Sequence, residues 1–378
     1  MEFSIETAAV QRAVKMLSVV VKANAEDHTG RILVETKESS VEFSANNGIN
    51  SITIDIAEVN IVSPGKVSVA YNKIKTFVMS FRPWDGTYGS KRFNFKSIDT
   101  NTNVTVDNTS ESGEKIKGKL RLSNFNTANI ILPPRFGEAE FSLNSSVFKL
   151  AMNKVLYAIN PSGDNRSSYL QGMNIKFDDA SIYFAGTDGR VISEYEVKNN
   201  TLKREGSVTL HYDFVMGVRR LINDDSQMLF DLSNNKASVK FDDVVFSGRK
   251  LMGTEYPNYS VEFGKFDYCI NINKEFLVGF LSPFSEVLDP EDNFRVSLEI
   301  KDKVIRLYND QASMESTQDI EGGIDFSIDA NGKLLLQSID TIKDDFLLFK
   351  FSDADGSLIF DSSKYNNQKS LVTCLRKR

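Results

Sequence analysis

The sequence is poor in the residues on which disulfides, metal sites and histidine-based catalysis depend. Its 378 residues include two cysteines, Cys269 and Cys374, and two histidines, His28 and His211. The cysteines are far apart and lack CxxC spacing, which indicates two ordinary thiols in a reducing compartment. Two histidines leave little for zinc binding or a histidine-based triad. We therefore expect no metal and no cofactor.

Long hydrophobic runs and net positive charge are also missing. The start, MEFSIETAAV, has no basic or apolar region of a secretory signal, and no run approaches a membrane span. With 41% hydrophobic and 25% charged residues, the composition is that of a soluble globular protein. We expect a cytoplasmic protein of two or three domains without membrane association. The net charge of −6 argues at first against nucleic-acid binding.

A short strand leading into an amphipathic helix occurs three times. These strands lie at 3–5, 141–143 and 268–270. A second unit, in which a glycine opens an alternating strand and then a helix, begins at Gly65, Gly206 and Gly323. Because the two units keep their order and similar spacing each time, the sequence predicts three repeats of one α+β domain.

Each predicted domain has two helices backed by a larger antiparallel sheet. The segments LPPR and EFGK mark the boundaries, which gives domains at 1–134, 135–263 and 264–378. The polar segment 84–120 is predicted to form hairpins with a long loop in the first domain.

Two patterns that suggest chemistry have a simpler interpretation. The segment 113–120, GEKIKGKL, matches a phosphate loop but ends in Leu120, and an alternating strand follows where a phosphate loop would open a helix. Acidic pairs such as Asp178-Asp179 lie between strands, where aspartate makes turns. No motif indicates an enzyme.

The segment GTDGRVI, 186–192, predicts by itself a hairpin with a two-residue Asp188-Gly189 turn. It is preceded by YLQGM at 169–173 and followed by GTEYPNY at 253–259. This series of motifs resembles the middle domain of the bacterial sliding clamp, the β subunit of the replicative DNA polymerase holoenzyme. The segment PGKVSVAYNKI, 64–74, is similar to the first domain of that family, whereas the third domain matches more loosely.

The resemblance implies a head-to-tail homodimer that closes into a ring of six clamp domains. Helices would line a hole for duplex DNA, and the sheets would form the outer wall. Such a protein is a DNA polymerase processivity factor without an active site, and its partners are a replicative polymerase and a clamp loader. The chain end, SLVTCLRKR, departs from the family and is compatible with a divergent phage or plasmid version.

The resemblance also implies a peptide-docking pocket between the second and third domains. Its residues would be Leu170, Thr187, Gly189, Arg190, Val191, Ile192, Pro257, Cys374, Leu375 and Arg376. Apolar walls would hold a Leu or Phe anchor, while backbone groups and Arg190 would bind polar atoms of the peptide.

Positive charge is concentrated on the predicted helices of the first two domains. Four helical windows hold ten basic residues against Glu6 and Asp213, so the negative charge lies elsewhere. A ring can therefore be acidic outside and basic inside. The residues predicted to face DNA are Arg12, Lys15, Lys22, Lys73, Lys75, Lys149, Lys154, Arg166, Tyr169, Arg219 and Arg220.

Ring closure is predicted to bring the segment SEVLDPEDNF, 285–294, of one chain against the strand LRLSNF, 120–125, of the other. Val287 and Leu288 would face Leu120 or Leu122 in a small apolar centre with a polar rim. Two alternatives remain open: a β-rich shell or tail protein that does not bind DNA, and a hydrolase with scattered acidic residues.

Overall fold

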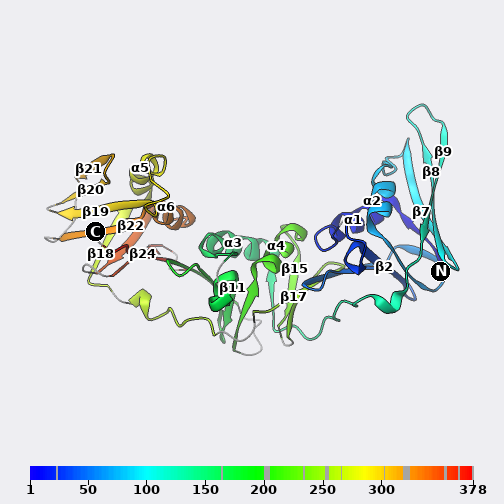
Figure 1. Cartoon of the computed structure of the whole chain (residues 1–378), viewed down its shortest axis with the longest axis horizontal. Coiled ribbons are helices and arrows are strands. Elements are labelled where there is room, and N and C mark those ends of the chain that lie inside the picture. The colour runs from blue at the N-terminus through cyan, green and yellow to red at the C-terminus, as the bar shows by residue number, and fades with distance from the viewer. Residues whose placement is uncertain are drawn as a thin grey trace. The chain divides into compact units, whose positions relative to one another are not determined.

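Figure 1 shows a computed structural model of the chain. It describes residues 1–378 except 23, 163–164, 200–204, 233–234, 252–254, 265, 302, 318–323, 353–355, 365–366 and 377–378. The chain divides into two compact units. The first unit comprises Met1–Ser146 and Asp213–Lys250, and the second comprises Val147–Tyr212 and Leu251–Arg378.

The first unit contains two antiparallel sheets. One has the strand order β5-β1-β7-β8-β9, and the other has the order β10-β15-β16-β17-β4-β3-β2-β6. The elements are β1 (Glu2–Glu6), α1 (Thr7–Leu17), β2 (Arg31–Thr36), β3 (Val41–Asn46), β4 (Asn50–Ile56), β5 (Val59–Ser63), β6 (Lys66–Ala70), α2 (Tyr71–Met79), β7 (Gly89–Ile98), β8 (Asn101–Thr109), β9 (Lys115–Ser123), β10 (Phe141–Asn144), α4 (Tyr212–Leu221), β15 (Gln227–Asp231), β16 (Lys236–Phe241) and β17 (Val244–Arg249).

The second unit also contains an eight-stranded sheet, with the order β14-β11-β12-β13-β25-β24-β23-β18, and a four-stranded sheet, β21-β20-β19-β22. Its elements are α3 (Ser145–Val155), β11 (Gly172–Phe177), β12 (Ser181–Thr187), β13 (Val191–Lys198), β14 (Gly206–His211), β18 (Tyr268–Asn273), α5 (Lys274–Ser285), β19 (Arg295–Lys301), β20 (Val304–Tyr308), β21 (Ser313–Thr317), β22 (Asp325–Asn331), α6 (Gly332–Thr341), β23 (Phe346–Phe351), β24 (Ser357–Ser362) and β25 (Gln368–Thr373).

The predicted strand–helix pairs are confirmed. The first kind of pair is β1–α1, β10–α3 and β18–α5, and the second is β6–α2, β14–α4 and β22–α6. In the third repeat an asparagine begins each helix: the Asn273 side chain accepts from Phe276 N at 2.9 Å, and Asn331 accepts from Leu334 N at 3.0 Å. These caps satisfy amide groups that a helix start leaves free.

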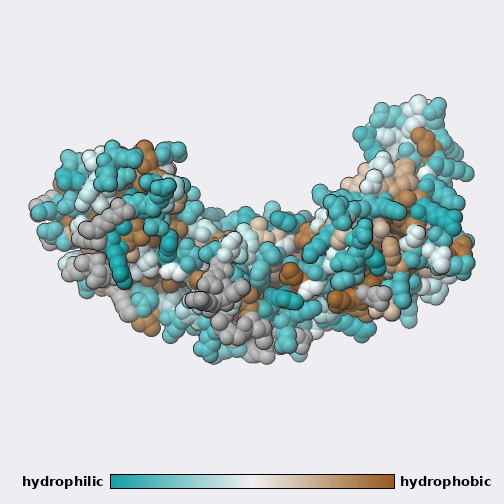
Figure 2. Space-filling view, in the orientation of Figure 1, coloured by the Kyte–Doolittle hydropathy of each residue, from teal (hydrophilic) through white to brown (hydrophobic). Residues whose placement is uncertain are grey.

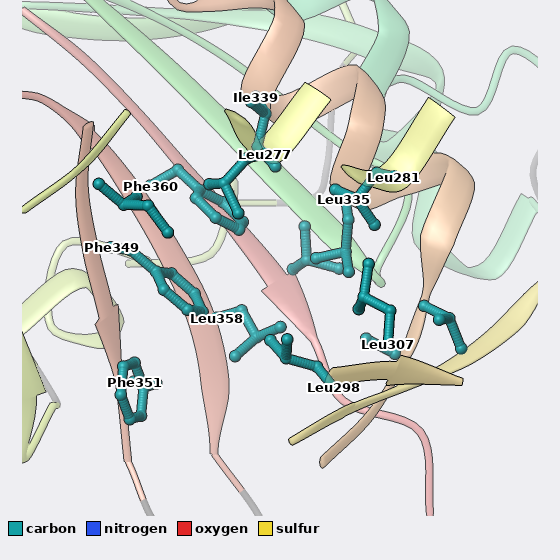
Figure 3. Packing of buried hydrophobic residues seen from close by; sticks show 14 of the residues in the cluster. Leu277, Leu281, Leu298, Leu307, Leu335, Ile339, Phe349, Phe351, Leu358 and Phe360 are labelled. Carbon is teal, nitrogen blue, oxygen red and sulfur yellow. The ribbon is translucent and has the colours of Figure 1, made fainter. Parts of the chain in front are cut away.

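Each unit has its own hydrophobic core between helices and sheets. In the first unit the Phe3 and Phe95 rings stack at 4.7 Å, and Val10 and Val14 of α1 are fully buried. Figure 3 shows the second-unit core, where Leu277 and Leu281 of α5 and Leu335 of α6 lie above side chains of the sheets. Figure 2 shows that hydrophilic residues dominate the visible surface, with separate hydrophobic patches.

The polar segment 84–120 is more regular than predicted. It forms β7, β8 and most of β9, and the turn between β8 and β9 contains Gly113 at φ +84°. The phosphate-loop pattern at 113–120 therefore falls on a turn and a strand. The prediction of a long loop was wrong, because asparagine- and threonine-rich sequence forms paired strands here.

The three repeats are joined by continuous sheets. Strand β17 pairs with β4 in the first unit, and β25 pairs with β13 in the second. Each eight-stranded sheet thus joins half of one repeat to half of the next. The domain boundaries at 134 and 263 stay a prediction, since the two compact units divide the chain differently.

Candidate functional site

The segment GTDGRVI forms a tight turn at the end of β12. Thr187 pairs with Ile192 across the hairpin, and Gly189 has φ +87°. The Asp188 carboxylate accepts from Arg190 N at 2.8 Å and from Val191 N at 2.9 Å. The hairpin prediction is confirmed, but the two-residue turn was wrong: four residues lie between the paired positions, because the Asp188 side chain supplies the acceptor that closes a longer loop.

The same turn occurs in the other two repeats. Asn47 between β3 and β4 accepts from Ile49 N at 3.0 Å and Asn50 N at 2.8 Å. Asn309 between β20 and β21 accepts from Gln311 N at 3.0 Å and Ala312 N at 2.8 Å. The repeat of this turn was not predicted from the sequence, because the three turn segments share few residues. Each turn nevertheless begins with an Asn or Asp whose side chain accepts the hydrogen bonds.

The chain end lies directly beside the middle turn. Val191 pairs with Val372, and Ile192 pairs with Leu371. Thr373 N donates to Arg190 O at 2.8 Å, and Leu375 N donates to Asp329 O at 2.7 Å. The structure therefore brings the predicted pocket residues 187–192 and 374–376 together, although they come from distant parts of the sequence.

Polar contacts hold this region in place. The Arg190 guanidinium donates to Asn293 Oδ1 at 3.1 Å, and Arg295 donates to Arg376 O at 3.0 Å. Arg295 also forms an ion pair with Asp329 at 2.6 Å. Arg190 remains exposed, so its guanidinium is available to a partner.

Val191 and Ile192 lie on opposite faces of the sheet. Val191 has no exposed surface and packs with Val372 in the core beneath the helices, where Cys374 also packs. Ile192 is half-buried on the other face, against Tyr256 and the buried Tyr259. Alternation along a strand allows only one of the two to reach a bound peptide. The assignment of Val191 to the pocket wall was therefore wrong.

Thr187 is also buried, and its hydroxyl donates to Val191 O at 2.7 Å, so it shapes the turn. Leu170 is half-buried and Pro257 is exposed. Exposed or half-buried members of the predicted pocket are thus Leu170, Gly189, Arg190, Ile192, Pro257, Cys374, Leu375 and Arg376.

An aromatic cluster next to Pro257 was missed by the sequence analysis. Four aromatic rings form a row in which the centroids of successive rings lie 5.8–5.9 Å apart: Tyr169, Tyr256, Tyr259 and Phe263. Burial raises the pKa of Tyr256 and Tyr259, and it raises the pKa of the neighbouring Glu194 against the effect of a hydrogen bond with Tyr259. The two tyrosines of the GTEYPNY motif, three residues apart, were the feature of the sequence that could have indicated this cluster.

The basic residues predicted to face DNA differ in accessibility. Lys149 and Tyr169 are half-buried, and the Arg166 side chain lies outside the described residues. Arg12 is exposed but forms a two-contact ion pair with Asp243. The exposed remainder is Lys15, Lys22, Lys73, Lys75, Arg219 and Arg220.

Lys154 does not face solvent. Only 5% of the residue is exposed, and its ammonium group donates to Thr341 O at the end of α6. Burial lowers the pKa of Lys154 to about 8, assisted by the nearby charges of Lys343 and Lys274. Its assignment to a DNA-facing surface was wrong, because the charge of a helix window does not reveal which side chains pack inward.

Two of the predicted interface anchors are core residues. Leu122 and Leu288 are 1% and 7% exposed, so neither is available to a second chain. Leu120 is half-buried and Val287 is 40% exposed. A charged substitution at Leu288 would therefore disrupt the core of the second unit.

Within the described residues, no group of three or more His, Cys, Asp or Glu side chains could hold a metal ion. Among the same residues, no helix is both long and apolar enough to cross a membrane.

Comparisons with known proteins match this geometry. Residues 142–258 match the family described as DNA polymerase III beta subunit, central domain. The chain is similar in structure to the DNA polymerase III subunit beta from Pseudomonas aeruginosa, with a TM-score of 0.86 and 14% identity. It is also similar to the beta subunit from DNA polymerase of Streptococcus pyogenes, with a TM-score of 0.82 and 19% identity, and both matches cover 100% of both chains. The fold is that of the bacterial sliding clamp. The resemblance drawn from the sequence is thereby confirmed.

A curated relative, the beta sliding clamp of Mycoplasma capricolum, is 21% identical over 241 residues. The match spans 62% of this chain and 64% of that relative. The chain thus matches less than two thirds of the length of that relative.

Proposed function

We propose that this chain is a DNA polymerase processivity factor, a sliding clamp that closes into a ring around duplex DNA. It tethers a replicative polymerase, is opened by a clamp loader and carries no active site of its own. Its proposed place of action is the cytoplasm, with the DNA that it encircles.

The observation that carries this proposal is a pair of strand edges. Two junctions between repeats are made within the chain, by β4 with β17 and by β13 with β25. The strands in the equivalent positions of the third and first repeats are β21 and β9. In the described part of the chain, each of them pairs with a neighbouring strand on one side only. A second copy arranged head to tail supplies the missing neighbour at both ends, which closes two chains into a ring.

The β9 edge is basic, and both free edges carry apolar groups. Lys115, Lys117, Lys119 and Arg121 alternate along β9 and are all exposed, whereas Glu315 of β21 is paired with Arg306 at 3.0 Å. On the opposite face of each strand lie the half-buried Leu120 and Met314. These features support an interface at β21 rather than at 285–294, with Leu120 still proposed as one of its apolar anchors. An exposed edge also needs a cover, because unpaired strand edges promote aggregation.

DNA contact is proposed for the exposed basic residues of the helices. Lys15, Lys22, Lys73, Lys75, Arg219 and Arg220 can attract the phosphate backbone without reading base sequence. Arg12 contributes less, since Asp243 already neutralises it. Retention on DNA then depends mainly on ring closure.

Partner peptides are proposed to dock beside the middle turn. Leu170, Ile192 and Pro257 supply apolar contacts, while Arg190 and backbone groups near Leu375 bind polar atoms of the peptide. The altered chain end, Cys374-Leu375-Arg376, is where the preference for a particular peptide would differ from that of related clamps.

Native mass spectrometry tests ring closure. We expect the wild-type chain to form a dimer and Leu120→Lys to be monomeric, because the added charge lies in the apolar centre of the β9–β21 contact. Ile98→Lys is the matched control, since Ile98 is 51% exposed on β7 of the same sheet and not on its edge. A dimeric Leu120→Lys variant, or a monomeric wild type, contradicts the proposed closure.

A further inference from the structure

The five-stranded sheet of the first unit has an outer face that neither the docking pocket nor the DNA-facing helices use. Its inner face is packed, since Phe93, Phe95 and Val104 are at most 1% exposed. The side chains between these residues point to the opposite face, because side chains alternate along a strand. Figure 1 shows that the tip of the β8–β9 hairpin projects beyond α1 and α2.

A row of cations runs along β9 on this outer face. It consists of Lys115, Lys117, Lys119 and Arg121, which are all exposed and form no ion pair among the residues that the structure describes. Alternate residues of a strand lie about 7 Å apart, so the row is about 20 Å long. Asp107, opposite Lys117, is the only carboxylate of β8 and β9. Glu111 and Glu114 lie in the turn before the row, and Glu111 is 3.4 Å from Arg82.

A bulge in β7 places two further cations beside this row. The pairing of β7 with β8 shifts between Ser90 and Phe93, which leaves Lys91 and Arg92 opposite Asp107. Lys91 is exposed and Arg92 is half-buried.

The outer face of the whole sheet is basic. Its remaining charged residues are Lys96 of β7 and Glu2 and Glu6 of β1, and Lys96 is paired with Glu2 at 2.8 Å. Seven cations therefore stand against three carboxylates, and two of these carboxylates lie on β1, away from the cation row. Such a face attracts a polyanion.

Two aromatic rings with cations beside them lie in the turn between α2 and β7. Lys91 Nζ is 4.7 Å from the centroid of the Trp84 ring, and Arg82 Cζ is 5.0 Å from that of the Tyr88 ring. Both distances suit a cation–π contact. Trp84 and Tyr88 are half-buried, so part of each ring is open to solvent.

The turn that carries these rings is held in one conformation. The Asp85 carboxylate accepts from Thr87 N at 2.9 Å and from Tyr88 N at 3.0 Å. These hydrogen bonds lower the pKa of Asp85, and they use the carboxylate within the turn. The rings are therefore presented by a preorganised loop.

The aromatic turn adjoins the start of the cation row. Gly89, at the end of the turn, pairs with Thr109 of β8, and Thr109 pairs with Lys115 of β9. Rings and cations thus form one continuous surface at this end of the sheet.

We infer that this outer face is a binding site for single-stranded nucleic acid. The cation row binds successive phosphates, while Trp84 and Tyr88 stack on unpaired bases. A basic track beside aromatic rings is the combination with which proteins hold single strands without reading their sequence. A duplex keeps its bases stacked inside and would use the cations alone. The site is separate from ring closure, because pairing at the β9 edge joins backbone groups, whereas these side chains point to the face.

Fluorescence anisotropy with the full chain tests this inference. The probes are labelled oligothymidylate and oligouridylate of about 16 nucleotides at about 50 mM salt. We expect saturable binding of one or both, tighter than binding of a duplex of equal length. Lys119→Glu and Trp84→Ala should each weaken it about tenfold, whereas Trp84→Phe keeps an aromatic ring and should retain most of the affinity.

Two exposed residues of the second unit give matched controls. Lys176→Glu changes the net charge as Lys119→Glu does, and Phe346→Ala removes an aromatic ring as Trp84→Ala does. Both controls should bind like the wild type. Thermal unfolding of each variant shows whether it remains folded.

Four results would overturn the proposal. The first is the absence of saturable binding below about 1 mM, and the second is equal affinity in the wild type, Lys119→Glu and Trp84→Ala. An equal loss in Lys73→Glu would assign the binding to the helices, since Lys73 is exposed on α2. Competition by polyglutamate as strong as that by unlabelled oligonucleotide would indicate an acidic protein as the partner.

Discussion

Lys154 is a buried cation that fixes the end of one helix. Its ammonium group and that of Lys274 both donate to carbonyl groups at the C-terminus of α6, with Lys274 reaching Ile342 O at 2.6 Å. Cations suit this position because the last carbonyls of a helix are unpaired and carry partial negative charge. The cost of burying the charge appears in the pKa of Lys154, which falls to about 8.

This pKa predicts a pH dependence of stability. Between the folded-state pKa of about 8 and the ordinary value of 10.5, the unfolded chain binds more protons at Lys154 than the folded chain. Stability should therefore rise with pH in that window. From pH 7.5 to 9.5 the wild type should gain about 2 kcal/mol in unfolding free energy relative to Lys154→Met.

Urea unfolding of both proteins at the two pH values measures this difference. The comparison with the mutant removes the pH dependence of stability that the two proteins share. A constant difference between the two proteins would show that Lys154 titrates normally.

The opposite orientations of Val191 and Ile192 give a second prediction. Val191→Asp buries a carboxylate in the core and should cost more than about 3 kcal/mol of stability. Pro257→Asp and Arg190→Ala change exposed residues, so stability should stay within about 0.5 kcal/mol while stimulation of the cognate polymerase falls at least about tenfold.

Pro290→Asp is the matched control, because Pro290 is exposed outside the pocket. Thermal unfolding and primer extension are measured on each variant. Full stimulation by both Pro257→Asp and Arg190→Ala would place peptide docking elsewhere.

At the scale of elements, the turn that begins with Asn47, Asp188 or Asn309 is the most regular repeat. Each side chain accepts two backbone hydrogen bonds and fixes the register of its hairpin. Asp188→Ala should cost about 1–2 kcal/mol, since two amides lose their acceptor. Asp188→Asn should cost little, because asparagine already serves in the other two repeats. Equal unfolding free energies for the two variants would contradict this role.

Much of the element order could be predicted from the sequence. Strand–helix pairs have distinct periodicities, and their threefold recurrence in one order is a strong signal. The orientation of individual side chains was harder to predict. Lys154, Leu122 and Leu288 were predicted to be accessible to DNA or to a second chain but are buried. The sequence also could not show that β17 joins β4 or that β25 joins β13, because such pairings depend on tertiary contacts between distant segments.

The candidate site was predicted as a set of residues rather than as a surface. The TDGR motif and the chain end do meet, as the family resemblance implied. The strand alternation that turns Val191 into the core was available in the sequence, since β-strand side chains alternate. The aromatic cluster around Tyr256 was hidden because its contacts depend on a segment that crosses the sheet.

In the whole molecule, one of the equivalent sheet junctions between repeats is not formed within the described chain. Two of three equivalent junctions are made within the chain, and we propose that a second copy completes the third. A closed ring needs only weak electrostatic contact with DNA, since topology prevents dissociation. The exposed helix lysines and arginines are the residues proposed to make such contact, which should weaken steeply with salt.

Retention on circular and linear DNA tests whether the protein encircles DNA. The clamp is loaded onto a nicked plasmid by its loader, freed from unbound protein by gel filtration at high salt, and followed after the plasmid is cut once. We predict that the protein stays on the circle, dissociates after linearisation, and that Leu120→Lys is not retained on either form. Equal retention on circular and linear DNA would contradict the claim that this chain holds DNA by encircling it.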